Sequence, residues 1–139
     1  MHSQHQITSS PGAISRRVLI ADDDQDTALS LRVLLELQGH TVFTAFSGTD
    51  ALELADKEHP EAAVLDIAMP GLDGCAVAEC IRQRSWGRGV TLIAASGYGQ
   101  IEDLERAKAA GFDHYLLKPM EPDTINRLIG GVGPNDSTA

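Results

Sequence analysis

The sequence predicts an α/β fold in which a doubly wound, five-stranded parallel sheet carries helices on both faces. Short apolar runs of strand length alternate with amphipathic helical patterns along the chain. Strands that alternate with helices form parallel sheets covered on both faces. Five such strands joined by right-handed crossovers are most simply wound in the order 2-1-3-4-5, which leaves a topological switch point between the first and third strands.

The first two units of the predicted fold have clear helix ends. In order, they comprise a strand at 18–21, a helix at 26–38, a strand at 41–46 and a helix at 49–58. Gly39 is placed to end the first helix, and Pro60 follows the second. Ser47 and Asp50 have the spacing of a capping box, which predicts the start of the second helix between them.

The remaining three units follow the same pattern. They comprise a strand at 62–66, a helix at 74–84, a strand at 91–95, a helix at 100–110, a strand at 114–117 and a helix at 122–129. Gly111 is placed to end the fourth helix, and Pro122 suits the first position of the fifth.

The length and charge of the chain limit the classes of protein to which it can belong. The 139 residues predict one domain, at 18–130, between a flexible N-terminal tail or linker at 1–17 and a flexible C-terminal tail at 131–139. A net charge of −9 argues against nucleic acid or an anionic membrane as the direct partner. Cys75 and Cys80 lie five residues apart on one predicted helix, which disfavours a disulfide and favours a reducing, cytoplasmic location. We expect neither a signal peptide nor a membrane-spanning helix.

Acidic residues gather at the predicted switch point. Asp22, Asp23 and Asp24 follow the first strand, and Asp66 ends the third. Carboxylates that converge in this way repel one another, and a hard divalent cation with oxygen ligands, most commonly Mg²⁺, relieves the repulsion. An alternative explanation is that these acids only stabilise the N-terminus of the following helix, where the helix dipole favours negative charge. This alternative accounts for Asp24 and Asp26 but not for Asp66, which ends an apolar strand.

A basic and a hydroxyl-bearing residue are expected at the same edge of the sheet. Lys118 ends the fifth strand, and Ser96 ends the fourth. Three carboxylates, one Mg²⁺ and one lysine leave the site close to neutral, so an entering phosphoryl group would be tolerated. Phosphoryl transfer depends mainly on positioning and charge stabilisation, and an aspartate can itself be the nucleophile.

Four segments in this order resemble the receiver domain of two-component response regulators. They are VLIADDD at 18–24, LDIAMPGLDG at 65–74, ASGYG at 95–99 and YLLKP at 115–119. The resemblance runs over 18–130 and implies a flavodoxin-like (βα)5 single domain of the CheY-like kind. It further implies a phosphoacceptor switch in a His-Asp phosphorelay, which catalyses its own phosphotransfer and autodephosphorylation without being an enzyme in the usual sense.

The resemblance implies a role for each residue of the site. Asp66 would accept the phosphoryl group, and Lys118 would pair with the phosphoryl oxygens. Asp23 and Asp66 would bind Mg²⁺ through their side chains and Ala68 through its backbone carbonyl, while Asp22 would act mainly through bound water.

The resemblance also implies switch residues and residues that set the lifetime of the phosphorylated state. Ser96 would move toward the phosphoryl group, Tyr115 would turn inward behind it, and the bond from Lys118 to Pro119 would be cis. Ala68 offers no side chain to orient water, and Tyr98 is bulky enough to shield the site. We therefore expect an intermediate or long lifetime.

The implied partners are a sensor histidine kinase or histidine phosphotransfer protein and an unidentified downstream protein, with the chain a monomer or weak homodimer. Only nine residues follow Gly130, so we expect output by protein contact or onward phosphotransfer. A receiver module cut from a hybrid histidine kinase is an alternative. A small Mg²⁺-dependent phosphohydrolase with an aspartyl nucleophile is another, although the cap domain usual in such enzymes is missing from the pattern.

The first predicted helix is apolar around more of its circumference than packing on a sheet requires. One stripe is expected to face the sheet and comprises Ala28, Leu31, Leu34 and Leu35. A second comprises Leu29, Val33 and Leu37. The second stripe indicates either a binding surface or packing beneath a neighbouring helix or the N-terminal tail. The family resemblance implies that this face would dock the helical histidine domain of the kinase.

Overall fold

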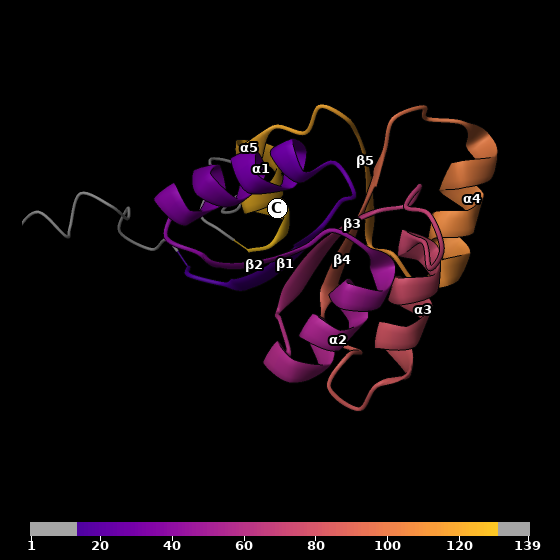
Figure 1. The fold of residues 1–139 in the computed structure, drawn as a ribbon, viewed down its shortest axis with the longest axis horizontal. Helices are drawn as coiled ribbons and strands as arrows, with labels where there is room; N and C mark the ends of the chain where they lie inside the picture. Colours follow the sequence, from indigo (N-terminus) through magenta and orange to yellow (C-terminus); the bar gives the residue numbers. More distant parts are fainter. Residues whose placement is uncertain (1–13, 131–139) are drawn as a thin grey trace, which may run out of the picture.

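The computed structural model describes residues 14–130 and contains five βα units around one parallel sheet (Figure 1). The strand order is β2-β1-β3-β4-β5, as the sequence predicts. The elements are β1 (Arg17–Ala21), α1 (Gln25–Leu37), β2 (Thr41–Ala45), α2 (Gly48–Glu58), β3 (Ala62–Asp66), α3 (Gly74–Gln83), β4 (Thr91–Ser96), α4 (Ile101–Ala110), β5 (His114–Leu117) and α5 (Pro122–Leu128). Each lies within one residue of its predicted limits.

The chain enters the fold just before β1. Ser15 Oγ donates a hydrogen bond to the carbonyl of Gly39 at 2.7 Å, and the Arg16 amide donates to Nδ1 of His40 at 3.0 Å. The remainder of the flexible tails expected at 1–17 and 131–139 lies outside the described residues.

Helices cover both faces of the sheet. Helices α1 and α5 pack on one face, and α2, α3 and α4 pack on the other (Figure 1). Every residue of β3 is buried, because this strand is central and covered from both sides. The carboxyl ends of β1 and β3 therefore lie side by side between the two helical layers.

The helix ends have the expected local chemistry. Asp24 caps α1 by accepting hydrogen bonds from the amides of Asp26 and Thr27, and Ser47 caps α2 by accepting one from Asp50. Gly111 ends α4 with a φ of 102°, a left-handed conformation that favours glycine. Capping by Asp24 starts α1 directly after the acidic segment and orients that segment toward the sheet edge.

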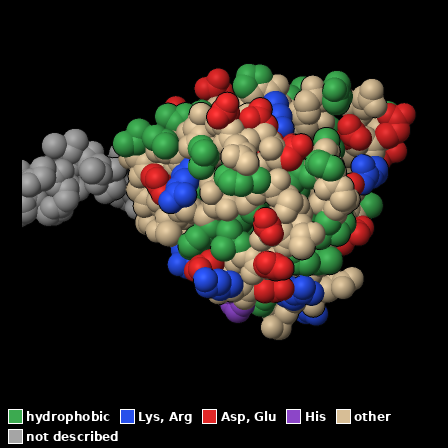
Figure 2. Space-filling model, viewed as in Figure 1, with side chains coloured by type: hydrophobic (Ala, Val, Ile, Leu, Met, Phe, Trp, Pro, Cys, Tyr) green, Lys and Arg blue, Asp and Glu red, His purple; other side chains and the backbone are tan. Residues whose placement is uncertain are grey.

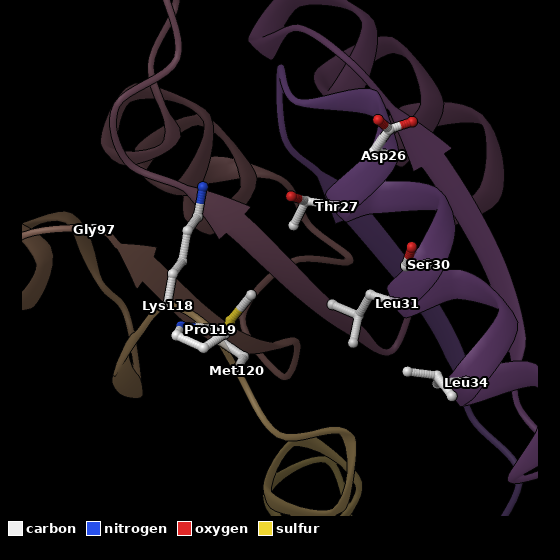
Figure 3. Close-up of a pocket in the computed structure, with 9 residues that line it drawn as sticks. All are labelled: Asp26, Thr27, Ser30, Leu31, Leu34, Gly97, Lys118, Pro119 and Met120. Carbon is white, nitrogen blue, oxygen red and sulfur yellow. The ribbon is translucent and has the colours of Figure 1, made fainter.

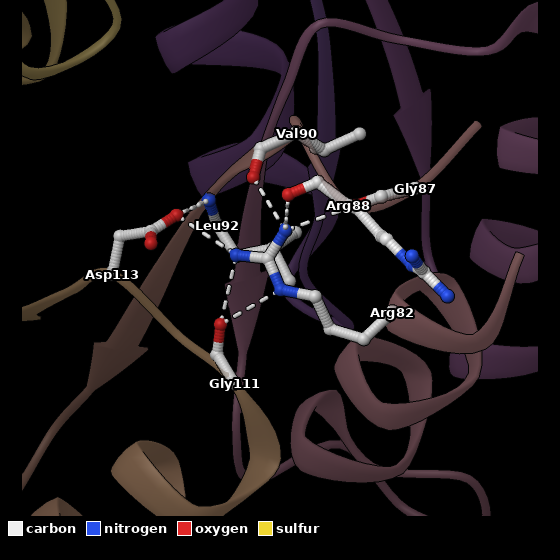
Figure 4. A network of polar contacts seen from close by, with 7 residues as sticks. All are labelled: Arg82, Gly87, Arg88, Val90, Leu92, Gly111 and Asp113. Carbon is white, nitrogen blue, oxygen red and sulfur yellow. Dashed lines mark hydrogen bonds and ion pairs between the residues drawn. The ribbon is translucent and has the colours of Figure 1, made fainter. Parts of the chain in front are cut away.

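One arginine joins three segments at the end of the sheet opposite the carboxyl ends of β1 and β3 (Figure 4). The guanidinium of Arg82, on α3, donates to backbone carbonyls both before β4 and after α4, which belong to Gly87, Arg88, Val90 and Gly111. It also pairs with Asp113 at 2.9 Å, and Asp113 in turn accepts a hydrogen bond from the Leu92 amide. The sequence pattern contains no sign of this network.

Helix α1 buries a narrower stripe than the sequence predicts. Ala28, Leu31 and Leu35 are buried, but Leu34 is 44% exposed, so its assignment to the buried stripe was wrong. Leu34 lies at the edge of the helix, beside the segment after β5, where the sheet does not cover it. Within residues 14–130 no helix is both long and apolar enough to span a bilayer.

Candidate functional site

Three carboxylates meet at the carboxyl ends of β1 and β3. Asp22 follows β1 and is 3% exposed, Asp66 ends β3 and is 4% exposed, and Asp23 is exposed to solvent. One carboxylate oxygen from each lies within 4.8 Å of the others. The strand order brings these side chains together because β1 and β3 are hydrogen-bonded neighbours. Asp24, the fourth acid of the segment, caps α1 instead.

Lys118 joins the two buried carboxylates. Its Nζ lies 2.9 Å from Oδ2 of Asp22 and 3.0 Å from Oδ2 of Asp66. The lysine follows β5, so its side chain reaches past the end of β4 to the end of β3. The peptide bond from Lys118 to Pro119 is cis, as the family resemblance implies.

Burial and charge act together on these groups. Burial raises the pKa of Asp22, and the hydrogen bonds from Lys118 and the Asp24 amide offset this only partly. Burial opposes the charge of Lys118, yet its hydrogen bonds to Asp22 and Asp66 outweigh that effect and raise the pKa of the lysine. The lysine therefore stays charged, and it partly neutralises a site with excess negative charge.

Backbone amides orient both buried carboxylates. Oδ1 of Asp66 accepts a hydrogen bond from the Ala68 amide at 2.9 Å, and Oδ1 of Asp22 accepts one from the Asp24 amide at 2.9 Å. In each case the second oxygen faces Lys118. The segment after β3 folds back closely, since a Cβ on Gly74 would lie 2.4 Å from the carbonyl oxygen of Asp66. Only glycine fits there.

Ser96 ends β4 at the same edge and is 1% exposed. Its Oγ accepts hydrogen bonds from the amides of Tyr98 and Gly99, at 3.2 and 3.5 Å. Tyr98 is 81% exposed, and the shielding of the site expected from its bulk stays a prediction. Tyr115 is half-buried on β5, and its buried hydroxyl has no hydrogen-bond partner among the described residues.

A pocket lies beside Lys118, between α1 and the segment that follows β5 (Figure 3). Its lining combines polar residues from the start of α1 with apolar residues from both segments, namely Asp26, Thr27, Ser30, Leu31, Leu34, Gly97, Lys118, Pro119 and Met120. Sequence reasoning missed this pocket. The spacing of Asp26, Thr27 and Ser30 on one side of α1 is the signal that could have revealed it.

The donor set of the acidic cluster suits a hard cation. Carboxylate and carbonyl oxygens are the ligands that Mg²⁺ prefers, and it is commonly held by one or two carboxylates. Asp22, Asp23 and Asp66 supply carboxylate oxygens at this edge of the sheet, with no competing nitrogen or sulfur ligand in the cluster. The residues present therefore fit Mg²⁺.

Known proteins are similar to this chain in sequence and in fold. The chain is 38% identical over 112 residues to an uncharacterized 14.6 kDa protein of Leptolyngbya boryana, covering 81% of this chain and 86% of that one. It is 41% identical over 108 residues to the transcriptional regulatory protein PrrA of Mycobacterium tuberculosis, covering 78% of this chain but 46% of PrrA. The chain thus spans less than half the length of that regulator.

One similar solved structure contains a magnesium ion. The receiver domain of the sensor histidine kinase PA1611 from Pseudomonas aeruginosa, solved with a magnesium ion in its active-site cleft, matches with a TM-score of 0.75 and 26% identity. The match covers 84% of this chain and 95% of that one.

A five-stranded doubly wound domain with buried acids and a lysine at its switch point defines a receiver-type signalling module. The sequence profile of the response regulator receiver domain matches residues 18–129. The chain belongs to the response regulator receiver domain family of two-component signalling. Receiver domains bind Mg²⁺ at an acidic pocket and interact with histidine kinases or phosphotransfer proteins.

Proposed function

We propose that the protein is a phosphoacceptor switch in a His-Asp phosphorelay and is phosphorylated on Asp66. The observation that carries this proposal is the position of the Asp66 carboxylate, which is 4% exposed and is held between the Ala68 amide and Lys118. Its neighbours Asp22 and Asp23 complete a site that has excess negative charge without a cation.

In the proposed reaction a carboxylate oxygen of Asp66 attacks phosphorus. A new O–P bond forms and the P–N bond of a phosphohistidine breaks, and the electron pair leaves with the imidazole nitrogen. Lys118 already contacts the Asp66 carboxylate and would pair with the phosphoryl oxygens. The domain thereby catalyses its own phosphorylation, and we assign autodephosphorylation to the same site.

We assign the metal ligands as the side chains of Asp23 and Asp66 and the carbonyl of Ala68, with Asp22 acting through bound water. When bound, Mg²⁺ would supply charge stabilisation to the transferring phosphoryl group. Ser96 and Tyr115 are the proposed switch residues. The buried hydroxyl of Tyr115 has no hydrogen-bond partner within residues 14–130, and this supports the role, because such a group gains a hydrogen bond if its surroundings rearrange.

The pocket in Figure 3 supports a phosphodonor as partner. It opens beside Lys118, so a protein surface that fills it would lie close to Asp66. We propose that a sensor histidine kinase or histidine phosphotransfer protein docks there, and that output passes by contact with a downstream protein. The cytoplasmic location inferred from composition stays a prediction.

Intact mass after incubation with Mg²⁺ and acetyl phosphate tests the proposal. We expect one added phosphoryl group in the wild type, and none in Asp66→Ala or without Mg²⁺. Asp24→Asn is a matched control, because asparagine caps a helix about as well as aspartate and Asp24 is not in the metal cluster.

The outcomes separate the proposed switch from other functions. An adduct that persists in Asp66→Ala would contradict the assignment of the acceptor. Sustained turnover of a small phosphoester, in place of stoichiometric labelling by acetyl phosphate, would favour a phosphohydrolase. If neither acetyl phosphate nor a phosphorylated histidine phosphotransfer protein labels the folded wild type, the phosphoacceptor proposal fails.

A further inference from the structure

His40 is a buried histidine that the phosphoacceptor site does not use. It lies between α1 and β2 and is 5% exposed, whereas Figure 2 shows acidic and basic side chains over the visible face of the molecule. His40 directly precedes β2, which runs parallel to β1 and β3, and Asp66 is the last residue of β3. The two residues therefore lie at opposite ends of the sheet, and the His40 ring takes no part in phosphoryl transfer.

Each ring nitrogen of His40 has one hydrogen-bond partner. Nδ1 lies 3.0 Å from the backbone nitrogen of Arg16, and Nε2 lies 2.6 Å from Oδ1 of Asn126 on α5. A backbone amide can only donate, so Nδ1 accepts and carries no proton. A side-chain amide oxygen can only accept, so Nε2 carries the proton and donates it. The two contacts together require a neutral imidazole with its single proton on Nε2.

These contacts join segments that lie far apart in the chain. The Arg16 amide belongs to the segment before β1, His40 precedes β2, and Asn126 lies on α5, which packs beside α1 on one face of the sheet (Figure 1). Arg16 also donates from Nε to the carbonyl of Ile129, at 3.0 Å, and its own carbonyl accepts from the Thr41 amide at 2.9 Å. The end of α5 is therefore held to the start of the sheet by groups that the neutral His40 ring positions.

The charged groups around His40 are engaged with other partners. Residues 37–45, which run from the end of α1 through β2, contain no Asp, Glu, Lys or Arg. The charged side chains on the segments that surround the ring are Glu36, which pairs with Arg32 at 3.1 Å, Arg16, which pairs with Glu61 at 3.4 Å, Asp123, which accepts from Gln38 at 2.8 Å, and Arg127. Both nitrogens of the ring contact uncharged groups, so no carboxylate within residues 14–130 pairs with it.

We propose that the contacts of His40 with Arg16 and Asn126 form an acid-sensitive lock, which holds α5 to the segment before β1 only while the ring is neutral. Uptake of a proton from solvent would form an N–H bond at Nδ1 and set it against the N–H of Arg16. The hydrogen bond is then lost, and the charged ring is buried without a carboxylate partner among the described residues. Opening of the lock releases α5 and Arg16 and leaves the Asp66 site intact.

The direction of the pH effect follows from proton binding. In the unfolded chain a histidine takes up a proton near its ordinary pKa of about 6.5, whereas the closed lock keeps His40 neutral. The unfolded state then binds more protons, so the free energy of unfolding falls as the pH drops below about 6.5. Asp22 acts in the opposite direction, because burial raises its pKa and its protonation favours the fold. The two effects are therefore distinguished by their sign.

NMR of the full wild-type chain in EDTA, without any phosphodonor, tests the lock directly. Long-range proton–nitrogen spectra at neutral pH should show His40 as the neutral tautomer with its proton on Nε2. Hydrogen-exchange protection, referred to the intrinsic exchange rate at each pH, then follows the opening. On acidification to about pH 5.5, we expect protection of the Arg16 and Ile129 amides to fall about tenfold relative to that of Val64, in the centre of the sheet.

Urea denaturation of variants supplies a second, independent measurement. His40→Gln places an uncharged amide at the site, which can still donate to Asn126 but takes up no proton in this pH range. Its denaturation midpoint should therefore fall less on acidification than that of the wild type. His59→Gln is the matched control, because His59 is exposed and stacks on Trp86, away from the lock. This control should keep the loss of stability. If His40→Gln does not fold, the NMR titration of the wild type decides.

Three results would overturn the proposal. The first is a His40 ring that carries a proton on Nδ1 at neutral pH, as the other tautomer or as the charged form. The second is protection of the Arg16 and Ile129 amides that stays constant relative to Val64 on acidification. The third is a folded His40→Gln variant that loses as much stability on acidification as the wild type. None of these results bears on phosphorylation of Asp66.

Discussion

Replacing Asp22 by asparagine is expected to stabilise the fold while it weakens Mg²⁺ binding. Asp22 is 3% exposed and its pKa is raised, chiefly by burial. An acid with a raised pKa opposes folding when it is ionised, because the folded state disfavours its charge. Asparagine has the same shape, can still accept the hydrogen bond from the Asp24 amide, and carries no charge.

The distances around Asp22 set the size of the effect. At an effective dielectric constant of about 20, the contact with Lys118 at 2.9 Å is worth about 6 kcal/mol of attraction. The Asp66 carboxylate, within 4.8 Å, contributes about 3.5 kcal/mol or more of repulsion, and the exposed Asp23 adds less. The net attraction of about 2 kcal/mol or less does not offset a desolvation cost of several kcal/mol per ion. We therefore expect Asp22→Asn to gain about 1–3 kcal/mol in the free energy of unfolding.

Urea denaturation in EDTA at neutral pH measures this gain. The cost of ionised Asp22 is fully present above its raised folded-state pKa and vanishes below its ordinary value of 3.8. The advantage of the variant should therefore shrink as the pH falls toward 3.8. Added Mg²⁺ should stabilise the wild type more than the variant, since a ligand stabilises the state that binds it.

Two results would refute this reasoning. If Asp22→Asn is less stable than the wild type in EDTA, the attraction of Lys118 outweighs burial and repulsion. If the control Asp24→Asn gains as much stability, the effect comes from the overall charge of the chain. Asp24 caps α1, and the hydrogen bonds with Thr27 lower its pKa, so its ionised form favours the fold and its replacement should bring no gain.

Substitutions at four further positions give separate tests. Gly74→Ala should cost about 2–4 kcal/mol in urea denaturation, because its Cβ would lie 2.4 Å from the Asp66 carbonyl oxygen; an unchanged midpoint would contradict the close approach. Arg82→Leu should cost about 3 kcal/mol, since it leaves four backbone carbonyls without their donor, and a loss below 1 kcal/mol would show that water replaces it. Ser47→Ala should cost about 1 kcal/mol through loss of the α2 cap, whereas Ser47→Asp should cost little. Ala68→Glu should change the dephosphorylation rate measured after removal of the phosphodonor, and an unchanged rate would count against a role of position 68 in the lifetime.

Two residues, Ala68 and Tyr98, underlie the expected intermediate or long lifetime of the phosphorylated state. Tyr98 is 81% exposed, so it can shield Asp66 only if its side chain moves toward the site. The small side chain of Ala68 remains next to Asp66, because its amide binds the Asp66 carboxylate. The expectation stays a prediction.

Local patterns in the sequence determined the elements and the general position of the site. Strand-length apolar runs and helix-capping residues such as Ser47 and Gly111 act within a few neighbouring residues, so their structural consequences are readable from the chain itself. The order of the strands follows from the handedness of crossovers, and it places Asp22 and Asp66 at one edge.

Contacts between residues far apart in the chain were decided only by the tertiary structure. The sequence placed Lys118 at the site but did not show that it joins Asp22 to Asp66, 52 residues before it. It also contained no sign that Arg82 reaches the start of both β4 and β5, or that Leu34 lies outside the buried stripe. The reach and exposure of a side chain depend on what packs around it. The apolar periodicity of a helix shows which of its side chains share a face, but not which other elements pack against that face.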